Sequence, residues 1–365
     1  MSLHLDDLRR YAIARSLFKP TTLMRAITRM GFVQADPIRA PARAQDLTLR
    51  HRVSGYRAGE LERRYPRLAL EEDFFVNYGF LPRATQALLH PRQARLQWPA
   101  QRQQQALQLR AHVAAQGVVH PRDVAAAFDH GKVVTWFGGN AHATTELLDG
   151  MHYRGMLRVA GREGGTRLYA LHLDELAANA MALEQRLEAL VQLIAQVYAP
   201  LPLASFTQLV GYLANGGPQW KAACRVAGKR VWSQLGQATV DGVSWGWPAD
   251  EAPASKRWQH DGQVRLLAPF DPVVWDRRRF ELFWGWRYRF EAYTPAAKRQ
   301  LGYYAMPLLW RGQVIGWGNL TVRDGQLQAQ LQYVAGKAPA DAAYAQALAA
   351  ELAAMGDFLG LGAAA

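Results

Sequence analysis

The sequence predicts an α+β fold in which tandem winged-helix repeats, each a helix-turn-helix followed by a wing, precede a small C-terminal antiparallel β domain. The first observation is a layout that occurs three times before residue 250: a helix, a short linker, a helix-turn-helix and two strand-like runs around a loop. The second is the stretch beyond residue 262, whose alternating, aromatic-rich runs are typical of an antiparallel sheet. The third is the length of 365 residues, which is sufficient for two to four domains.

The second repeat, residues 99–175, has the clearest signals. Residues 101–116 (QRQQQALQLRAHVAAQ) predict a helix that ends before Gly117, and Pro121 begins another in VVHPRDVAAAF. A third helix is expected over 141–155. After it, LRVA and RLYALH predict two strands joined by the glycine-rich loop GREGG, which together form the wing.

The other two repeats and the C-terminal domain follow from similar patterns. The first repeat, residues 1–98, has helices at 6–16 and 21–30 and ends less regularly, whereas the third, residues 176–249, ends in a strand pair turned at Asp241-Gly242. The polar stretch DEAPASKRWQHDG predicts a linker. The β domain is expected over 262–365, with turns at Arg311-Gly312 and Asp324-Gly325 and a closing Ala-rich helix over 341–355.

Charge and cysteine content restrict the class of partner. Lys and Arg total 43 and Asp and Glu total 30, so the formal net charge is +13, which favours nucleic acid over a membrane surface. The single cysteine, Cys224, excludes an internal disulfide and fits a reducing cytoplasm. Walker, HExxH and paired-cysteine motifs are absent from the sequence, and the ten histidines show no metal-ligand spacing. We therefore expect neither a metal nor a cofactor.

The segment MGFVQADPIRAPARAQDLTLRHR, residues 30–52, carries the candidate chemistry. FVQAD alternates after Gly31, so Gln34 and Asp36 are expected on the same side of an extended backbone. A carboxylate beside an amide can hold one water, with Asp36 as the proton acceptor. The alternative interpretation is that Asp36-Pro37 only begins a turn and that Gln34 is a surface residue, because QxD is a short pattern.

Other segments resemble a known family. LLAPFDPVVWDRRR at 266–279 and YRFEAYTPAAKRQLGYYAMPLLWRGQVIGW at 288–317 resemble the C-terminal β region of the winged-helix family of DNA glycosylases, the AlkZ-like proteins, in its YcaQ (AlkX) branch. VVTWFGGNAHATTELLDGMHYRGMLRV and MGFVQADPIRAPAR are more loosely similar, so the resemblance spans nearly the whole chain. The family writes its catalytic pair as QxQ or, in the YcaQ branch, QxD. Gln34 and Asp36 take those positions, and Arg43 falls on the arginine of the segment that follows.

The chain departs from the family at two places. It has FFVNY, residues 74–78, where relatives have WAHEA, so the His-Glu pair of the relatives is replaced by Val76 and Asn77. Arg39 stands where the relative has Asn. The resemblance implies a monofunctional DNA repair glycosylase that hydrolyses the N-glycosidic bond of alkylated bases, notably N7-alkylguanine, and that unhooks interstrand crosslinks made through that nitrogen.

The expected partner is double-stranded DNA with alkylated bases or crosslinks, bound by a monomeric, nucleoid-associated bacterial protein of the cytoplasm that enters no membrane. Phosphate contacts are expected near the QAD motif, on the second wing and in the TPAAKRQ loop, from Arg39, Arg43, Arg50, His51, Arg52, Arg83, Arg162, Arg167, Lys298 and Arg299. The main alternative is a winged-helix transcription regulator that binds DNA without catalysis, since the charge and the repeated helix-turn-helix fit it equally well. A non-catalytic lesion-binding protein is a third possibility.

Overall fold

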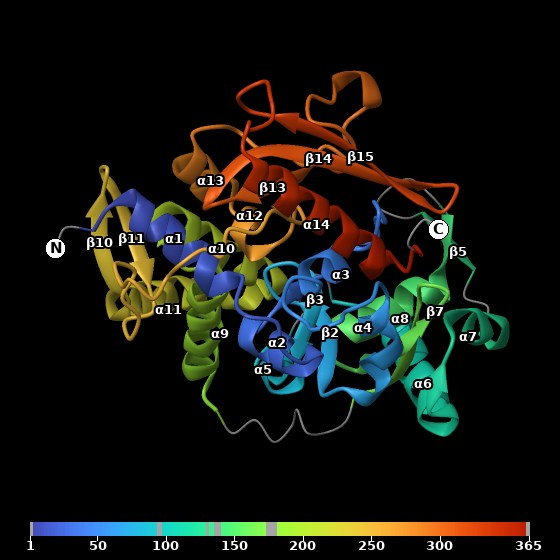
Figure 1. Cartoon of the computed structure of the whole chain (residues 1–365). Coiled ribbons are helices and arrows are strands. Elements are labelled where there is room, and N and C mark those ends of the chain that lie inside the picture. Colours follow the sequence, from blue (N-terminus) through green and yellow to red (C-terminus); the bar gives the residue numbers. More distant parts are fainter. Residues whose placement is uncertain (1–2, 93–96, 129–130, 135–139, 173–180, 363–365) are drawn as a thin grey trace. The chain divides into compact units, whose positions relative to one another are not determined.

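The computed structural model describes residues 3–92, 97–128, 131–134, 140–172 and 181–362, and it combines helices with antiparallel sheets (Figure 1). The predicted α+β class is therefore confirmed. Backbone contacts divide the chain into two compact units. The first unit comprises residues 1–61, 192–209 and 229–365, and the second comprises residues 62–191 and 210–228.

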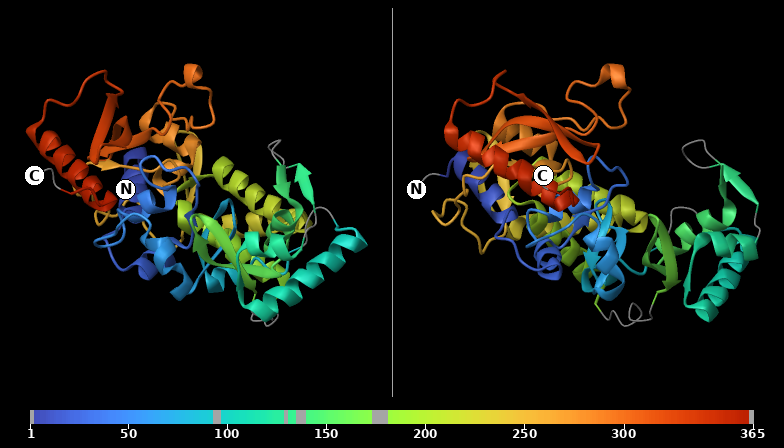
Figure 2. Two further views of the ribbon diagram at one scale, coloured as in Figure 1. Left: turned by 90° about the vertical axis from the view of Figure 1, so that its right-hand side faces the viewer. Right: turned by 45° about the vertical axis from the view of Figure 1, so that its right-hand side comes forward.

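The second predicted repeat lies within the second unit and has the expected elements. In order they are α6 (Ala100–Gln116), β4 (Val118–Val119), α7 (Pro121–Ala127), β5 (Lys132–Val134), β6 (Asn140–His142), α8 (Ala143–Tyr153), β7 (Leu157–Glu163) and β8 (Thr166–Leu171). Strand β4 pairs with β8, which pairs with β7, while β5 and β6 form a separate pair (Figure 2). Pro121 begins α7 because a first-turn residue needs no N–H donor. Residues 135–139 of the family-like stretch and the expected boundary at 175 lie outside the described residues.

The third predicted repeat has the same order of helix, short strand, two helices and hairpin. Its elements are α9 (Leu183–Tyr198), β9 (Leu201–Pro202), α10 (Leu203–Gly216), α11 (Lys221–Gln234), β10 (Gly236–Val240) and β11 (Val243–Trp247). Strand β9 adds to β11 just as β4 adds to β8. Asp241 and Gly242 both have positive φ, of 50° and 73°, so the hairpin turns where the sequence predicted.

The first predicted repeat contains the two expected helices and a strand that is shorter than expected. Its elements are α1 (Leu5–Ser16), α2 (Leu23–Met30), β1 (Val33–Gln34), α3 (Ala44–Leu49), α4 (Glu60–Arg64), β2 (Leu70–Phe74), β3 (Tyr78–Pro82) and α5 (Arg83–Ala87). Strand β1 ends at Gln34 because Asp36 begins a turn, in which its Oδ1 accepts the Ile38 N–H at 2.8 Å. The prediction that one strand carries both Gln34 and Asp36 is therefore wrong.

The C-terminal sheet has the strand order β12-β13-β14-β15, all antiparallel. Its strands and the helices around it are β12 (Arg265–Leu266), α12 (Pro272–Trp275), α13 (Arg277–Trp284), β13 (Met306–Trp310), β14 (Gln313–Arg323), β15 (Gln326–Tyr333) and α14 (Ala342–Leu359). Both predicted turns are confirmed, because Arg311-Gly312 joins β13 to β14 and Asp324-Gly325 joins β14 to β15. Helix α14 lies along this sheet, where Tyr344 packs on Trp310 with ring centroids 5.2 Å apart (Figures 1 and 2).

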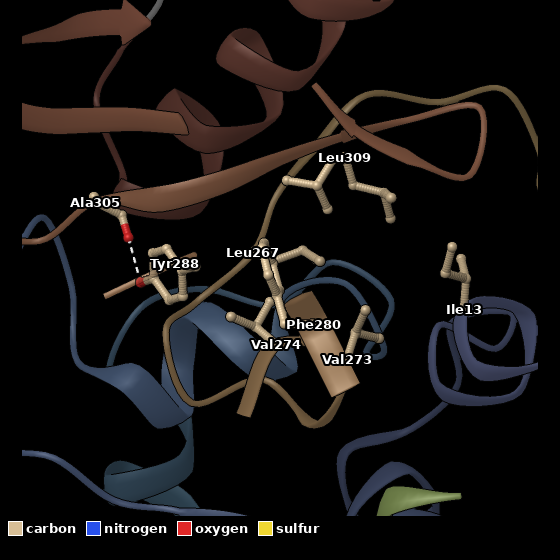
Figure 3. Packing of buried hydrophobic residues seen from close by; sticks show 9 residues of the cluster. Ile13, Leu267, Val273, Val274, Phe280, Tyr288, Ala305 and Leu309 are labelled. Carbon is tan, nitrogen blue, oxygen red and sulfur yellow. Dashed lines mark hydrogen bonds between the residues drawn. The ribbon is translucent and has the colours of Figure 1, made fainter. Parts of the chain in front are cut away.

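The N-terminal helix and the C-terminal sheet share one hydrophobic core. Ile13 of α1 packs in a buried cluster whose other members all come from residues 267–314, among them Phe280 of α13 and Leu309 of β13 (Figure 3). The Tyr288 hydroxyl donates to the Ala305 carbonyl at 2.6 Å within this cluster. The two compact units do not follow the predicted boundaries at 98, 175 and 249, and the division into winged-helix repeats stays a prediction. No helix in the described part of the chain is long and apolar enough to cross a membrane.

A buried ion pair connects distant parts of the first unit. Arg52 donates from Nη1 and Nη2 to the two carboxylate oxygens of Asp271, at 2.7 and 2.9 Å, and both side chains are 0% exposed. The remaining guanidinium donors bind the backbone carbonyls of Ser16 and Thr48 and the Ser16 hydroxyl. Asp271 also caps α12 by accepting the Val273 N–H at 3.0 Å. Every charge of the pair is thus compensated inside the core.

Replacing Arg52 tests how much stability this pair contributes. Arg52→Met leaves Asp271 charged and buried, so we expect the free energy of unfolding to fall by about 3–5 kcal/mol. Arg287→Met is the matched control, because its ion pair with Glu281 is exposed and such pairs contribute at most about 1 kcal/mol. Urea unfolding of both variants measures the difference, and equally small losses would contradict the structural role of Arg52.

Candidate active site

Gln34 is fixed by an aromatic residue from the far end of the chain. Helix α2 ends at Gly31, whose φ of 73° suits glycine and where a Cβ would lie 2.3 Å from Leu193 Cδ1. The chain then places Gln34 in β1 with 7% of its surface exposed, and Trp275 Nε1 donates to its Oε1 at 2.7 Å. Because an indole N–H can only donate, this bond sets the amide orientation and leaves the Gln34 NH₂ group to face other partners.

Asp36 is half-buried in the turn that follows β1. Its backbone N–H donates to Gln45 Oε1 at 3.3 Å, and Gln45 is itself 2% exposed on α3. Burial raises the pKa of the Asp36 carboxyl above its usual value, and the hydrogen bond from the Ile38 N–H opposes this only in part. The carboxylate is therefore a stronger base than an exposed aspartate.

A loop of the C-terminal domain brings aromatic rings close to this carboxylate. Burial, followed by the negative charge of Asp36, raises the pKa of both Tyr293 and Tyr304. Tyr293 is 76% exposed, whereas Tyr304 is 2% exposed. The Glu291 carboxylate braces the loop by accepting the backbone N–H groups of Gln300 and Leu301 at 2.8 and 2.7 Å. The charge of Asp36 thus acts on two aromatic side chains of this loop, one in solvent and one in the core.

Four of the expected cationic contacts retain their charge at the surface or in a partly exposed position. Arg39 and Lys298 are exposed and have no acidic partner in the described part of the chain. Arg43 is half-buried, just before α3. Arg299 donates from Nε to the Thr294 carbonyl at 2.8 Å and stacks on Tyr303, 5.0 Å from the ring centre.

Three other expected DNA contacts near the motif are wrong, because their side chains are used inside the fold. Arg52 is the buried partner of Asp271 described above. Arg50, with 4% of its side chain exposed, pairs with Glu351 of α14. The His51 ring hydrogen-bonds the Leu266 carbonyl at 3.1 Å, and burial lowers its pKa well below the usual value, so the ring carries no charge to offer a phosphate.

The three expected contacts of the second unit are neutralised by acidic residues. Arg83 pairs with Glu71 at 3.0 Å, and Arg162 donates to Glu72 at 2.9 Å, where both acids are buried on β2. Arg167 pairs with Asp149 at 3.0 Å and stacks on Tyr78. Arg162 and Arg167 also oppose each other across the hairpin, back from its glycine turn. Arg162 and Arg167 thus lie in ion pairs on the wing, and their contact with the DNA backbone stays a prediction.

The departure from the family lies in the turn between β2 and β3. Val76, in place of one polar residue of the relatives' His-Glu pair, is 4% exposed. Asn77 Oδ1 accepts the Tyr78 N–H at 2.8 Å, and the Asn77 carbonyl accepts the Phe75 N–H at 2.9 Å. This segment is hairpin structure, and it offers no acid or imidazole. Elsewhere in the described residues, no group of three or more His, Cys, Asp or Glu side chains could hold a metal ion.

Sequence reasoning missed Gln45, Trp275 and Tyr304 as members of the site. Trp275 was available as a signal, because it lies in the family-like stretch LLAPFDPVVWDRRR, but an aromatic residue in such a stretch is more typical of a hydrophobic core than of a site. Gln45 and Tyr304 have no local pattern that distinguishes them. Gln45 lies 9 positions from Asp36, and Trp275 lies 241 positions from Gln34. Only the fold brings these two residues into contact with the motif.

Comparison with known proteins identifies the family of the chain. The family described as DNA glycosylase AlkZ-like matches residues 27–358 of the chain. Among solved structures, the chain is similar to the DNA glycosylase AlkZ of Streptomyces sahachiroi, with a TM-score of 0.64 and 15% sequence identity over 99% of this chain and 98% of that one. At this identity the structural likeness shows the fold alone.

The raised pKa of Asp36 predicts that its charge costs stability. A carboxyl whose pKa is higher in the folded state binds more protons there, so stability falls as pH rises above the ordinary value of 3.8 and the loss is complete above the folded pKa. We expect Asp36→Asn to be as stable as the parent protein or more stable at pH 7, and Asp271→Asn, the control, to be less stable. Urea unfolding at pH 7 measures the free energy of unfolding of both variants. Equal destabilisation of the two would contradict the burial of an uncompensated charge at Asp36.

Proposed function

The chain belongs to the DNA glycosylase AlkZ-like family, and from that membership we propose that it hydrolyses the N-glycosidic bond of alkylated bases in double-stranded DNA. The proposed lesions are N7-alkylguanine and the interstrand crosslinks made through that nitrogen. The observation that supports this most directly is the construction of the QAD motif, in which Trp275 orients Gln34 and burial makes Asp36 a stronger base. The protein is proposed to act as a monomer, associated with the nucleoid in the cytoplasm.

The proposed reaction needs few catalytic groups. Alkylation at N7 makes guanine cationic, so the base leaves as a neutral molecule and takes the electron pair of the glycosidic bond. Asp36 accepts a proton from water while the water oxygen bonds to C1′ of the sugar, and the same carboxylate stabilises the positive charge that develops on the sugar. The Gln34 NH₂ group donates to that water, because the Gln34 carbonyl oxygen already accepts from Trp275.

The DNA contacts proposed for this reaction are those cations that retain a solvent-exposed or partly exposed charge. Arg39 and Arg43 follow the QAD motif, and Lys298 and Arg299 lie on the same C-terminal loop as Tyr293, whose pKa the charge of Asp36 helps to raise. Such side chains bind phosphates and position the duplex, and they do not read its sequence. Replacing one of them should weaken binding to every DNA sequence alike and reduce its salt dependence.

Substitution of Asp36 tests the proposed function. Loss of a positioned base costs about 10²–10⁴ in rate, so Asp36→Asn should lose most release of 7-methylguanine while keeping its affinity for DNA. Trp275→Phe should lose less, because Gln34 remains but its amide is free to rotate. Single-turnover release of base from methylated DNA measures both effects.

Asp261→Asn is the matched control. Asp261 makes the same kind of turn as Asp36, since its Oδ1 accepts the Gln263 N–H at 3.1 Å, and it should keep full activity. Undiminished base release by Asp36→Asn would refute the role of this carboxylate. Tight DNA binding by the parent protein with no base release from any alkylated substrate would favour the transcription regulator instead.

The charge of the lesion should determine which bases are released. A neutral base generally needs a protonated carboxyl to leave. Asp46, the next acid after Asp36, is 3% exposed and accepts the Tyr56 hydroxyl at 2.7 Å, while Val76 and Asn77 replace the relatives' His-Glu pair. We expect release of N7- and N3-alkylpurines but not of uracil or hypoxanthine. We also expect a rate that rises with pH through the Asp36 pKa and then stays level. Uracil release comparable to that of 7-methylguanine, or a falling alkaline limb, would show that a general acid acts.

A further inference from the structure

The first unit contains a cavity of about 290 Å³ whose lining includes neither Gln34 nor Asp36. The lining comes from the C-terminal ends of α1, α2 and α9 and from the polar segment that precedes β12. Its charged members are Arg15, Arg29, Glu251 and Arg257. Three positive charges thus face a single negative charge in this cavity.

Glu251 compensates only one of the three arginines. Both of its carboxylate oxygens accept from Arg15 Nε, at 3.0 and 2.9 Å, and Arg15 also donates from Nη1 to the Gln196 carbonyl. Arg29 and Arg257 form no ion pair with any residue that the structure describes. The cavity therefore carries two guanidinium charges that remain available to a ligand.

Aromatic rings hold these two guanidinium groups in place. Arg29 lies over the ring of Phe18, 4.2 Å from its centre, and Phe18 is buried. Arg257 lies over the ring of Trp258 at 4.3 Å. The indole is itself fixed, because its Nε1 donates to the Ala252 carbonyl at 2.8 Å. A cation–π contact positions an arginine without neutralising it, so its N–H donors can still bind an anion.

The positive charges of the cavity also repel each other. Burial first and the charge of Arg15 second lower the pKa of Arg29 below its usual value. The guanidinium nevertheless stays protonated, since arginine does not lose its proton in proteins. An anion bound in the cavity would offset this repulsion. A phosphate suits it best, because its oxygens accept two parallel N–H donors from one guanidinium.

We propose that this cavity binds a phosphate monoester of about nucleotide size, either a free nucleotide or the phosphate at the end of a DNA strand. The two available guanidinium charges match the charge of such a phosphate, about −1.5 to −2 at neutral pH. The volume is close to the lower end of the range for small-molecule sites, about 300–1,000 Å³, so there is room for more than the phosphate. Lining residues such as Met30, Pro272 and Trp258 offer apolar surface to a sugar or base.

Titration calorimetry on the full chain tests the proposal. The probe is deoxyguanosine monophosphate, and deoxyguanosine, which lacks the phosphate, is the control ligand. Arg29→Met and Arg257→Met each remove one charge from the cavity. Arg25→Met is the matched control variant, because Arg25 is exposed on the same helix, α2, and does not line the cavity.

We expect the parent protein and Arg25→Met to bind deoxyguanosine monophosphate much more tightly than deoxyguanosine. Each cavity variant should bind the nucleotide about 10- to 100-fold more weakly, as for loss of hydrogen bonds between charged groups. The melting temperature should stay close to that of the parent protein in all three variants, because none of them breaks an ion pair of the described residues. Weaker binding then reports on the cavity and not on unfolding.

A second pair of probes distinguishes the two sources of the phosphate. It consists of one oligonucleotide with a 5′-phosphate and the same oligonucleotide with a 5′-hydroxyl. If the site takes a strand end, the phosphorylated oligonucleotide binds more tightly, and Arg29→Met removes that difference. If the site takes a free nucleotide, deoxyguanosine monophosphate binds and the two oligonucleotides do not differ.

Two results would overturn the proposal. One is that neither the nucleoside nor the oligonucleotide gains affinity from its phosphate. The other is that Arg29→Met and Arg25→Met weaken binding equally, which would place the phosphate outside the cavity. Neither readout involves release of a base, so the proposed glycosylase function is tested separately.

Discussion

The candidate site depends on the ion pair between Arg52 and Asp271. Both charges are fully buried, so each is tolerable only in the presence of the other. Asp271 fixes the start of α12, and Trp275 is the last residue of that helix, four positions further on. The indole that holds Gln34 is therefore placed by a contact that itself spans 219 residues of sequence. Loss of this ion pair would disturb the position of Trp275 through one turn of helix, although neither Gln34 nor Asp36 is part of the pair.

The same pair shows why net charge overestimates the field that DNA would meet. The +13 of the sequence includes many arginines that hold the fold together, such as Arg52 and Arg50 in the first unit and Arg162 in the second. An arginine paired with a buried carboxylate contributes little potential at the surface. The charge available to a phosphate is concentrated on fewer side chains, among which Lys298 and Arg39 are exposed. For binding, the location of these cations matters more than the total.

Sequence reasoning predicted the parts of the fold that local chemistry determines. The Asp-Gly turns at 241 and 324 and the end of α2 at Gly31 each need a backbone conformation that few residues adopt, so the pattern specifies them. The predicted extent of β1 was too long because Asp36-Pro37 favours a turn over a continued strand. This turn had been the alternative interpretation of the motif. The partners of Arg50, Arg52 and Arg162 were unpredictable from local pattern, since their acids lie 301, 219 and 90 residues away.

The electrostatics of Asp36 relate the proposed chemistry to the proposed substrate. Burial favours the protonated form of the carboxyl, and a protonated carboxyl is no base. A cationic base bound beside it would favour the ionised form, because an opposite charge within a few ångströms lowers a carboxyl pKa. On the proposed function, the alkylated base therefore activates the group that removes it, whereas a neutral base leaves Asp36 with its raised pKa. Selectivity for charged lesions would then be aided by the attraction between the cationic base and the ionised carboxylate, and it requires neither a second acid nor a pocket shaped to each lesion.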